Sequence, residues 1–127
     1  MSEENILVVD DEAVIRDVCE QILESEGYAV TTAASGKEAL HLVSEHDFDA
    51  MVTDIMMPDM SGLELLEVIK RTSMTVSTVV ITGLGTFEMA TQSDRLGAKE
   101  FVVKPFTPDE LSEAVRKALR KRMIGAG

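Results

Sequence analysis

The sequence is poor in cysteine, in long hydrophobic runs and in positive charge, and each shortage excludes a class of protein. A single cysteine, Cys19, cannot form an internal disulfide and fits a reducing cytoplasm. No apolar stretch approaches the roughly 20 residues that a membrane helix needs. The acidic start, MSEEN, lacks the shape of a signal peptide. We therefore expect a cytoplasmic protein that has no membrane partner.

Acidic residues outnumber basic ones by 23 to 12, for a formal net charge of −11. This balance argues against direct contact with nucleic acid through a broad basic surface. A late basic cluster lies at the end of a predicted helix, where cations complement the helix dipole, so we do not interpret it as a basic arm. It consists of Arg116, Lys117, Arg120, Lys121 and Arg122. The excess acid elsewhere reflects either solubility or a pocket that binds a cation.

Short apolar runs alternate with longer amphipathic stretches along the 127 residues. Five runs rich in Val and Ile and bounded by turn signals predict strands: 6–9, 28–32, 50–53, 79–82 and 101–103. Several of them lack polar alternation, which indicates burial on both faces, as in a parallel sheet. We find no repeat, low-complexity segment or internal linker, and expect one domain over residues 1–127.

The stretches between the runs carry helix signals. Gly27 ends the first helix. Three later helices begin with capping pairs: Ser35 with Glu38, Ser61 with Glu64, and Thr107 with Glu110. The fourth helix, roughly 86–96, has the weakest apolar stripe. Strand followed by helix, five times, predicts a doubly wound α/β sandwich, in which ligands bind outside the carboxyl ends of the strands.

Chemistry-bearing residues stand at those carboxyl ends. Asp10 and Asp11 follow the first run, Asp54 follows the third, Thr82 ends the fourth and Lys104 follows the fifth. Carboxylates packed together raise one another's pKa unless a cation intervenes. Mg²⁺ is such a cation, and is usually held by one or two carboxylates plus phosphate oxygens. Asp54 can act as a nucleophile that forms an acyl phosphate, while the ammonium and the hydroxyl suit a phosphoryl group.

At these residues the sequence resembles the receiver domain of bacterial two-component response regulators. The matching segments, in order and spacing, are "VVDDE", "DIMMPDMSG", "ITG" and "GAKEFVVKPF", and the match covers nearly the whole chain. The resemblance implies a (βα)5, flavodoxin-like, three-layer α/β sandwich. Its five-stranded parallel sheet would have the strand order 2-1-3-4-5.

The resemblance also implies an acceptor and a metal site. Asp54 matches the aspartate that is phosphorylated, and Asp10 and Asp11 match the acidic pair that positions Mg²⁺, or Mn²⁺ in its place. Met56 matches the position whose backbone carbonyl is a metal ligand. With Asp54, these residues form the predicted metal site.

The remaining implied roles concern the phosphoryl group and the switch. Lys104 matches the lysine that pairs with a phosphoryl oxygen, and Pro105 the proline that follows a cis peptide bond. Thr82 matches the hydroxyl that moves toward the phosphate. Phe101 matches the switch aromatic, here without a hydroxyl.

The resemblance implies that the protein is a phosphoacceptor switch. It would assist its own phosphorylation and dephosphorylation, and we expect no other enzymatic activity. A histidine kinase or phosphotransfer protein would donate to Asp54, and the face formed by helix four, strand five and helix five would shift between two states. A phosphorylation-dependent dimer fits this reading. The output partner is unknown, and the chain is either a stand-alone regulator or a piece of a longer regulator or hybrid kinase.

Two alternatives suit the same sheet less well. A phosphohydrolase with an aspartate nucleophile would need a second acid, as general acid and base, two residues after Asp54. Met56 occupies that position. A flavodoxin-like FMN protein would need a phosphate-binding loop rich in Ser, Thr and Gly after the first strand. Asp10, Asp11 and Glu12 stand there instead and would repel phosphate without a metal.

Departures from the family pattern carry two further predictions. Ser93 and Asp94 fall where small and apolar residues are more usual, so we expect the fourth helix to be the most mobile element. Met56 and Leu84 match the two variable positions that, in this family, tune loss of the phosphoryl group, and neither side chain can orient water by a hydrogen bond. We therefore expect a long-lived acyl phosphate.

Overall fold

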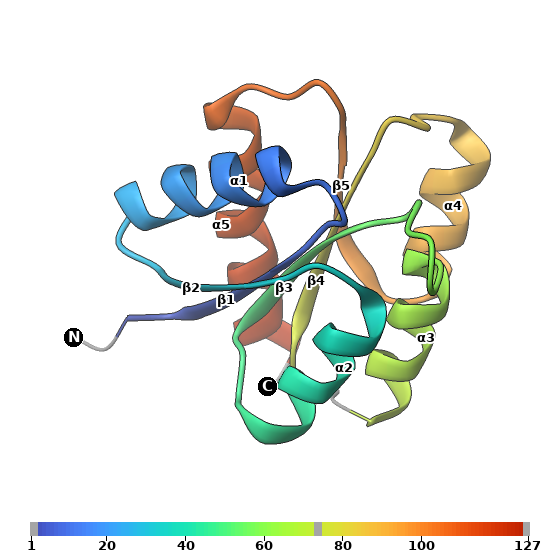
Figure 1. Cartoon of the computed structure of the whole chain (residues 1–127), viewed down its shortest axis with the longest axis horizontal. Coiled ribbons are helices and arrows are strands. Elements are labelled where there is room, and N and C mark those ends of the chain that lie inside the picture. The colour runs from blue at the N-terminus through green and yellow to red at the C-terminus, as the bar shows by residue number, and fades with distance from the viewer. Residues whose placement is uncertain (1–2, 73–74, 126–127) are drawn as a thin grey trace.

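The structure is a computed structural model that describes residues 3–72 and 75–125. Its five strands form one parallel sheet in the order β2-β1-β3-β4-β5, which confirms the predicted topology (Figure 1). The strands are β1 Asn5–Val9, β2 Ala29–Ala33, β3 Ala50–Asp54, β4 Ser77–Thr82 and β5 Ala98–Val103.

Helices follow each strand within the described residues and cover both faces of the sheet. They are α1 Ala13–Ser25, α2 Gly36–Glu45, α3 Gly62–Thr72, α4 Phe87–Arg95 and α5 Pro108–Gly125. Figure 1 shows α1 and α5 on one face and α2, α3 and α4 on the other. The predicted doubly wound sandwich is therefore confirmed. No helix among the described residues is long and apolar enough to span a membrane.

The core consists of two apolar layers that share the central strands. In β1, Ile6 and Val8 pack on the side of α1 and α5, while Leu7 and Val9 pack on the side of α2 and α3. All four side chains have no exposed surface. Successive strand residues point to opposite faces, so a run without polar residues is buried on both sides. This packing explains why the strands carry no polar alternation.

Strand boundaries differ from the predicted ones most clearly in β5. The structure begins this strand at Ala98, three residues before the predicted start at 101. The added residues include Lys99, which is exposed, and Glu100, which is half-buried. Since β5 lies at the edge of the sheet, it tolerates charged side chains that a central strand would exclude. An apolar run alone therefore underestimates the length of an edge strand.

The predicted helix signals have direct counterparts. Gly27 follows α1 with a φ of +95°, a left-handed conformation that favours glycine. At α5, Glu110 N–H donates to Thr107 Oγ1 at 3.1 Å and Thr107 N–H donates to Glu110 Oε1 at 2.7 Å, a complete capping box. At α2, Glu38 N–H donates to Ser35 Oγ at 3.1 Å. The Glu38 carboxylate there accepts from the N–H one residue before the cap.

Helix α4 has fewer buried residues than α1, α2 or α3. Its N-cap, Thr86, accepts from Met89 N–H at 3.1 Å. Ser93 is the residue of this helix classed as buried, and its hydroxyl donates to the Met89 carbonyl at 2.8 Å. At the other end, Lys70 of α3 donates to the Arg95 carbonyl at 3.1 Å. The mobility of α4 stays a prediction.

Candidate functional site

Two acids meet at the carboxyl edge of the sheet because their strands are parallel neighbours. Val9 of β1 pairs with Thr53 of β3, so the next residues, Asp10 and Asp54, stand side by side where the two strands end. Asp10 is fully buried and Asp54 is 5% exposed. Buried carboxylates need partners, because an unpaired charge in the interior carries a large desolvation cost.

Lys104, the residue after β5, supplies the partner. Its ammonium lies 3.0 Å from Asp10 Oδ2, 3.0 Å from Asp54 Oδ2 and 3.5 Å from Glu12 Oε1. The long side chain thus crosses the end of β4 and joins acids from the first and third strands. Residues far apart in the chain therefore form one cluster, as the order of the strands predicts.

Burial and pairing act in opposite directions on this cluster. Burial raises the pKa of the Asp10 carboxyl above its usual value, although hydrogen bonds from Glu12 N–H and Lys104 oppose the rise. Burial also acts to lower the pKa of Lys104. Its hydrogen bonds to Asp10 and Asp54 outweigh that effect and raise the pKa to about 12. The ammonium is therefore charged at neutral pH and holds the two aspartates together.

The carboxylates still outnumber the cation, so the cluster suits a further positive ion. One oxygen from each of Asp10, Glu12 and Asp54 lies within 4.8 Å of the other two. Oxygen ligands of this kind are those that Mg²⁺ takes. Asp11 is exposed and stands outside this group, whereas Glu12 belongs to it. The role of Asp11 as a metal ligand stays a prediction.

Sequence reasoning did not assign Glu12 to the site. The available signal was its place as the third acid of the run Asp10-Asp11-Glu12. Met56, whose backbone carbonyl is the fourth predicted metal ligand, has an exposed side chain. Its backbone N–H donates to Asp54 Oδ1 at 3.2 Å, which places this residue next to the Asp54 carboxylate.

The backbone of Asp54 is held by close packing at the start of α3. A Cβ at Gly62 would lie 2.2 Å from the Asp54 carbonyl oxygen, so a larger residue cannot stand there without movement. Gly62 N–H donates to the Ile55 carbonyl at 2.7 Å. The lack of a side chain at Gly62 thus allows α3 to begin in close contact with the backbone of Asp54.

The loop that follows Asp54 is also joined to α2. The Asp59 carboxylate accepts from the N–H groups of Gly36 at 3.2 Å and Lys37 at 3.0 Å. These hydrogen bonds, the one from Lys37 first, lower the pKa of Asp59 below its usual value. The first turn of α2 therefore holds Asp59, in the loop between β3 and α3, in place.

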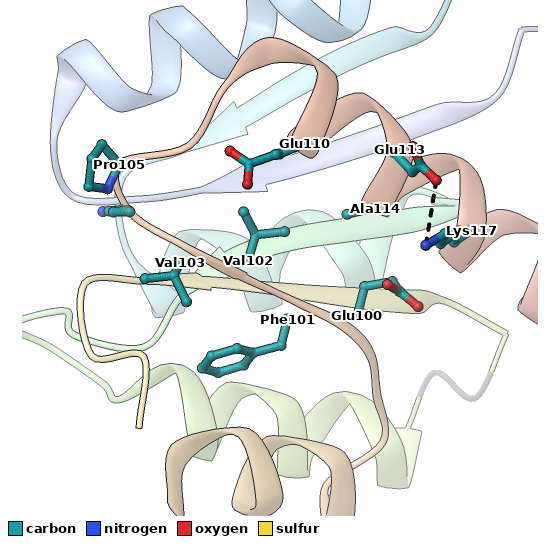
Figure 2. Close-up of a pocket in the computed structure, with 10 residues that line it drawn as sticks. Glu100, Phe101, Val102, Val103, Pro105, Glu110, Glu113, Ala114 and Lys117 are labelled. Atoms are coloured by element: carbon teal, nitrogen blue, oxygen red, sulfur yellow. Dashed lines mark ion pairs between the residues drawn. The ribbon is translucent and has the colours of Figure 1, made fainter. Parts of the chain in front are cut away.

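The predicted switch residues, Thr82 and Phe101, lie in β4 and β5. Thr82 is buried, and its Oγ1 accepts from Leu84 N–H at 3.1 Å. Figure 2 shows Phe101 and Val102 pointing to opposite faces of β5. The half-buried Phe101 packs with the core on the side of α3 and α4. The Lys104–Pro105 peptide bond is cis. The structure shows where these residues lie, and their switching roles stay predictions.

Comparison with known proteins shows the class to which this fold and cluster belong. Residues 6–116 match the model of the response regulator receiver domain. The chain therefore belongs to the response regulator receiver family, as the sequence segments predict. This membership makes it a signalling component of two-component systems, with a regulatory role.

Individual relatives agree with the family assignment. The chain is 39% identical over 117 residues to the response regulator SaeR of Staphylococcus aureus, covering 92% of this chain and 51% of that protein. It thus spans about half the length of the curated relatives it matches. A CheY-like receiver domain from Methanospirillum hungatei aligns with a TM-score of 0.92 at 35% identity, covering 98% of this chain and 99% of that one.

One solved relative is described as a complex with a metal. Response regulator TrrA from Thermotoga maritima, in complex with Mg²⁺ and BeF, aligns with a TM-score of 0.83 at 37% identity. The alignment covers 91% of this chain and 98% of that one.

Proposed function

We propose that residues 1–127 form one receiver domain that accepts a phosphoryl group on Asp54 from a histidine kinase or a phosphotransfer protein. The observation that carries this proposal is the cluster in which Lys104 joins Asp10 and Asp54 at the carboxyl edge of the sheet. It combines a nucleophile, a cation site and a phosphate-binding ammonium. Those are the elements that phosphoryl transfer requires.

The acids would hold a divalent cation, Mg²⁺ or Mn²⁺, and their oxygens lie close enough together to fit one. When bound, such an ion would offset the negative charge of the incoming phosphoryl oxygens. Asp10 and Asp54 are the proposed side-chain ligands, with Asp11 and the Met56 carbonyl completing the set that the family resemblance implies. The solved TrrA complex with Mg²⁺ and BeF supports this assignment by analogy.

In the transfer step, a carboxylate oxygen of Asp54 attacks phosphorus while the phosphorus–nitrogen bond of the donor phosphohistidine breaks. Lys104 lies 3.0 Å from Asp54 Oδ2, so a small shift brings its ammonium onto a phosphoryl oxygen. The released imidazole leaves with the donor protein. The chain contributes positioning and charge compensation, which dominate catalysis of phosphoryl transfer.

The switch would begin at Thr82. Its hydroxyl accepts from Leu84 N–H, so movement toward the phosphoryl group breaks the bond that holds the start of the β4–α4 loop. Phe101 then repacks, and the face formed by α4, β5 and α5 changes its affinity for an output partner. Phosphorylation thereby shifts an equilibrium between two existing states. We place the protein in the cytoplasm, where kinase and donor meet it, and expect no contact with nucleic acid.

The test is incubation with acetyl phosphate and Mg²⁺, followed by intact mass measurement. The wild-type chain should gain the mass of one phosphoryl group, and Asp54→Ala should gain none. Asp17→Asn, which removes an exposed acid of α1, is the matched control and should be phosphorylated like the wild type. Phosphorylation of the Asp54→Ala variant, or a wild type that stays unmodified with Mg²⁺ present, would refute the proposal.

A further inference from the structure

We propose that Glu12 is a third carboxylate of the divalent-cation site and raises the affinity of the site for its cation. The inference rests on the proposed function, because it concerns the same site. It adds a residue that neither the family resemblance nor the sequence reasoning assigns.

The position of Glu12 in α1 is the first observation. Glu12 is the N-cap residue, where a side chain commonly accepts a hydrogen bond from the first turn of the helix. Its side chain makes no such bond. Its Oε1 lies instead 3.5 Å from the Lys104 ammonium, over the site. The Glu12 carbonyl takes part in the helix, because it accepts from Arg16 N–H at 3.1 Å.

The backbone of Glu12 is fixed relative to the buried acids. Glu12 N–H donates to Asp10 Oδ1 at 2.9 Å, and the Arg16 guanidinium donates to the Asp10 carbonyl at 2.8 Å. This Asx-type turn holds the start of the Glu12 side chain beside Asp10. Its carboxylate therefore reaches the oxygens of Asp10 and Asp54 within 4.8 Å, which the carboxylate of Asp11 does not.

Exposure distinguishes Glu12 from the other two acids. Its side chain is 64% exposed, whereas those of Asp10 and Asp54 are 0% and 6% exposed. Both buried acids share Lys104 at 3.0 Å, while the contact of Glu12 is the longest of the three. Glu12 is thus the acid whose charge Lys104 compensates least. It can turn from the ammonium to an entering cation without leaving a buried group unpaired.

The charges around the site favour a contact between Glu12 and an entering cation. The cationic groups that contact the cluster are Lys104 and Arg16, and the Arg16 guanidinium is occupied by the Asp10 carbonyl. A divalent ion at Asp10 and Asp54 would repel the Lys104 ammonium at short range. A third carboxylate at the solvent side lowers that repulsion. Groups that stand beside the ligands of a metal commonly affect metal affinity by tenfold or more.

The test is calorimetric titration of the full chain with Mg²⁺, and separately with Mn²⁺, with no phosphoryl donor present. Glu12→Gln keeps the length and shape of the side chain and removes its charge. We expect it to weaken binding about tenfold. Asp17→Asn removes the same charge from an exposed position of the same helix and should weaken binding less than about twofold, because solvent and salt screen it.

Repeating both titrations in a Lys104→Met background separates a direct effect from one transmitted by the lysine. The loss caused by Glu12→Gln should persist there if Glu12 acts on the cation. A loss that disappears without Lys104 would overturn the proposal, as would Glu12→Gln binding like the wild type or like Asp17→Asn. A wild type that binds neither ion at millimolar concentration would instead refute the metal site of the proposed function, and this role with it.

Discussion

The loop from β3 to α3 and the loop from β4 to α4 leave the same edge of the sheet, yet their contacts differ. The first packs Gly62 against the backbone of Asp54 and is tied to α2 by Asp59. In the second, a Cβ at Gly83 would meet nothing within 4 Å, and the three atoms nearest to a Cβ at Gly85 belong to the side chain of Val103, which is exposed. One side of the site is therefore fixed and the other is lightly held.

The helices that follow these loops extend the contrast. Helix α3 buries Leu65, Leu66 and Ile69, whereas α4 buries Ser93 alone. A switch needs both kinds of support, because the acceptor must keep its position while another element moves. In this chain the proposed acceptor, Asp54, belongs to the firmly packed side, and the hydroxyl of Thr82 contacts the lightly held loop.

The largest effect should come from Gly62→Ala. The added methyl group would stand 2.2 Å from the Asp54 carbonyl oxygen and must displace backbone, so we expect a loss of about 3 kcal/mol in the free energy of unfolding. Chemical denaturation measures it. The control is Gly83→Ala, where the Cβ meets open space and the change should stay within about 0.5 kcal/mol. Equal losses in both variants would remove the contrast between the loops.

A second measurement compares the helices directly by native-state hydrogen exchange. The amides of α4 should open at free energies more than about 2 kcal/mol below those of α3, because local openings are easiest where few apolar side chains are buried. The lowest protection is expected near Phe87, whose side chain is 86% exposed. Protection in α4 that equals protection in α3 would contradict the predicted mobility.

The third prediction uses one residue from each loop. Met56 and Leu84 have exposed side chains that cannot orient water by hydrogen bonds. Replacing them with polar residues, Met56→Asn and Leu84→Glu, should speed hydrolysis of the acyl phosphate by at least about tenfold, since a positioned water reacts faster. Loss of the phosphoryl mass over time gives the rate. Val14→Asn with Val18→Glu, two exposed apolar residues of α1, is the control pair. A double variant no faster than the wild type would refute the long-lived state.

The smallest effect concerns Asp59. Its pKa is lowered in the folded chain, so its contribution to stability is present above the ordinary pKa of an aspartate, about 3.9, and is lost as the pH falls through the folded value. Asp59→Asn should cost less than about 1 kcal/mol at pH 7, because the group is exposed. The difference from the wild type should stay constant down to about pH 5 and narrow below pH 4. A difference that widens in acid would contradict this assignment.

Much of the fold was predictable because its signals are local. Uninterrupted apolar runs marked strands buried on both faces, and the pairs Ser35 with Glu38 and Thr107 with Glu110 marked helix starts. Edge strands were harder, as the start of β5 shows. Charged residues there face solvent, so hydrophobicity does not reveal that they belong to a strand.

Within the site, predictability stopped at the choice between neighbouring acids. The sequence placed Asp10, Asp54 and Lys104 at one edge, and the structure brings these three together. The sequence alone could not show that the carboxylate of Glu12 joins these three side chains while Asp11 faces solvent. That choice depends on how the turn after β1 is held by the bonds between Glu12 N–H, Arg16 and Asp10.

The sequence alone determined that a parallel sheet would form and which acids would stand at its edge. The order of apolar runs, helix caps and acids sufficed, because strand burial and helix capping act over a few residues. Only the tertiary structure decided which side chains share Lys104 and how closely Gly62 packs on Asp54. Those outcomes depend on contacts between residues far apart in sequence, whose distances no local pattern records.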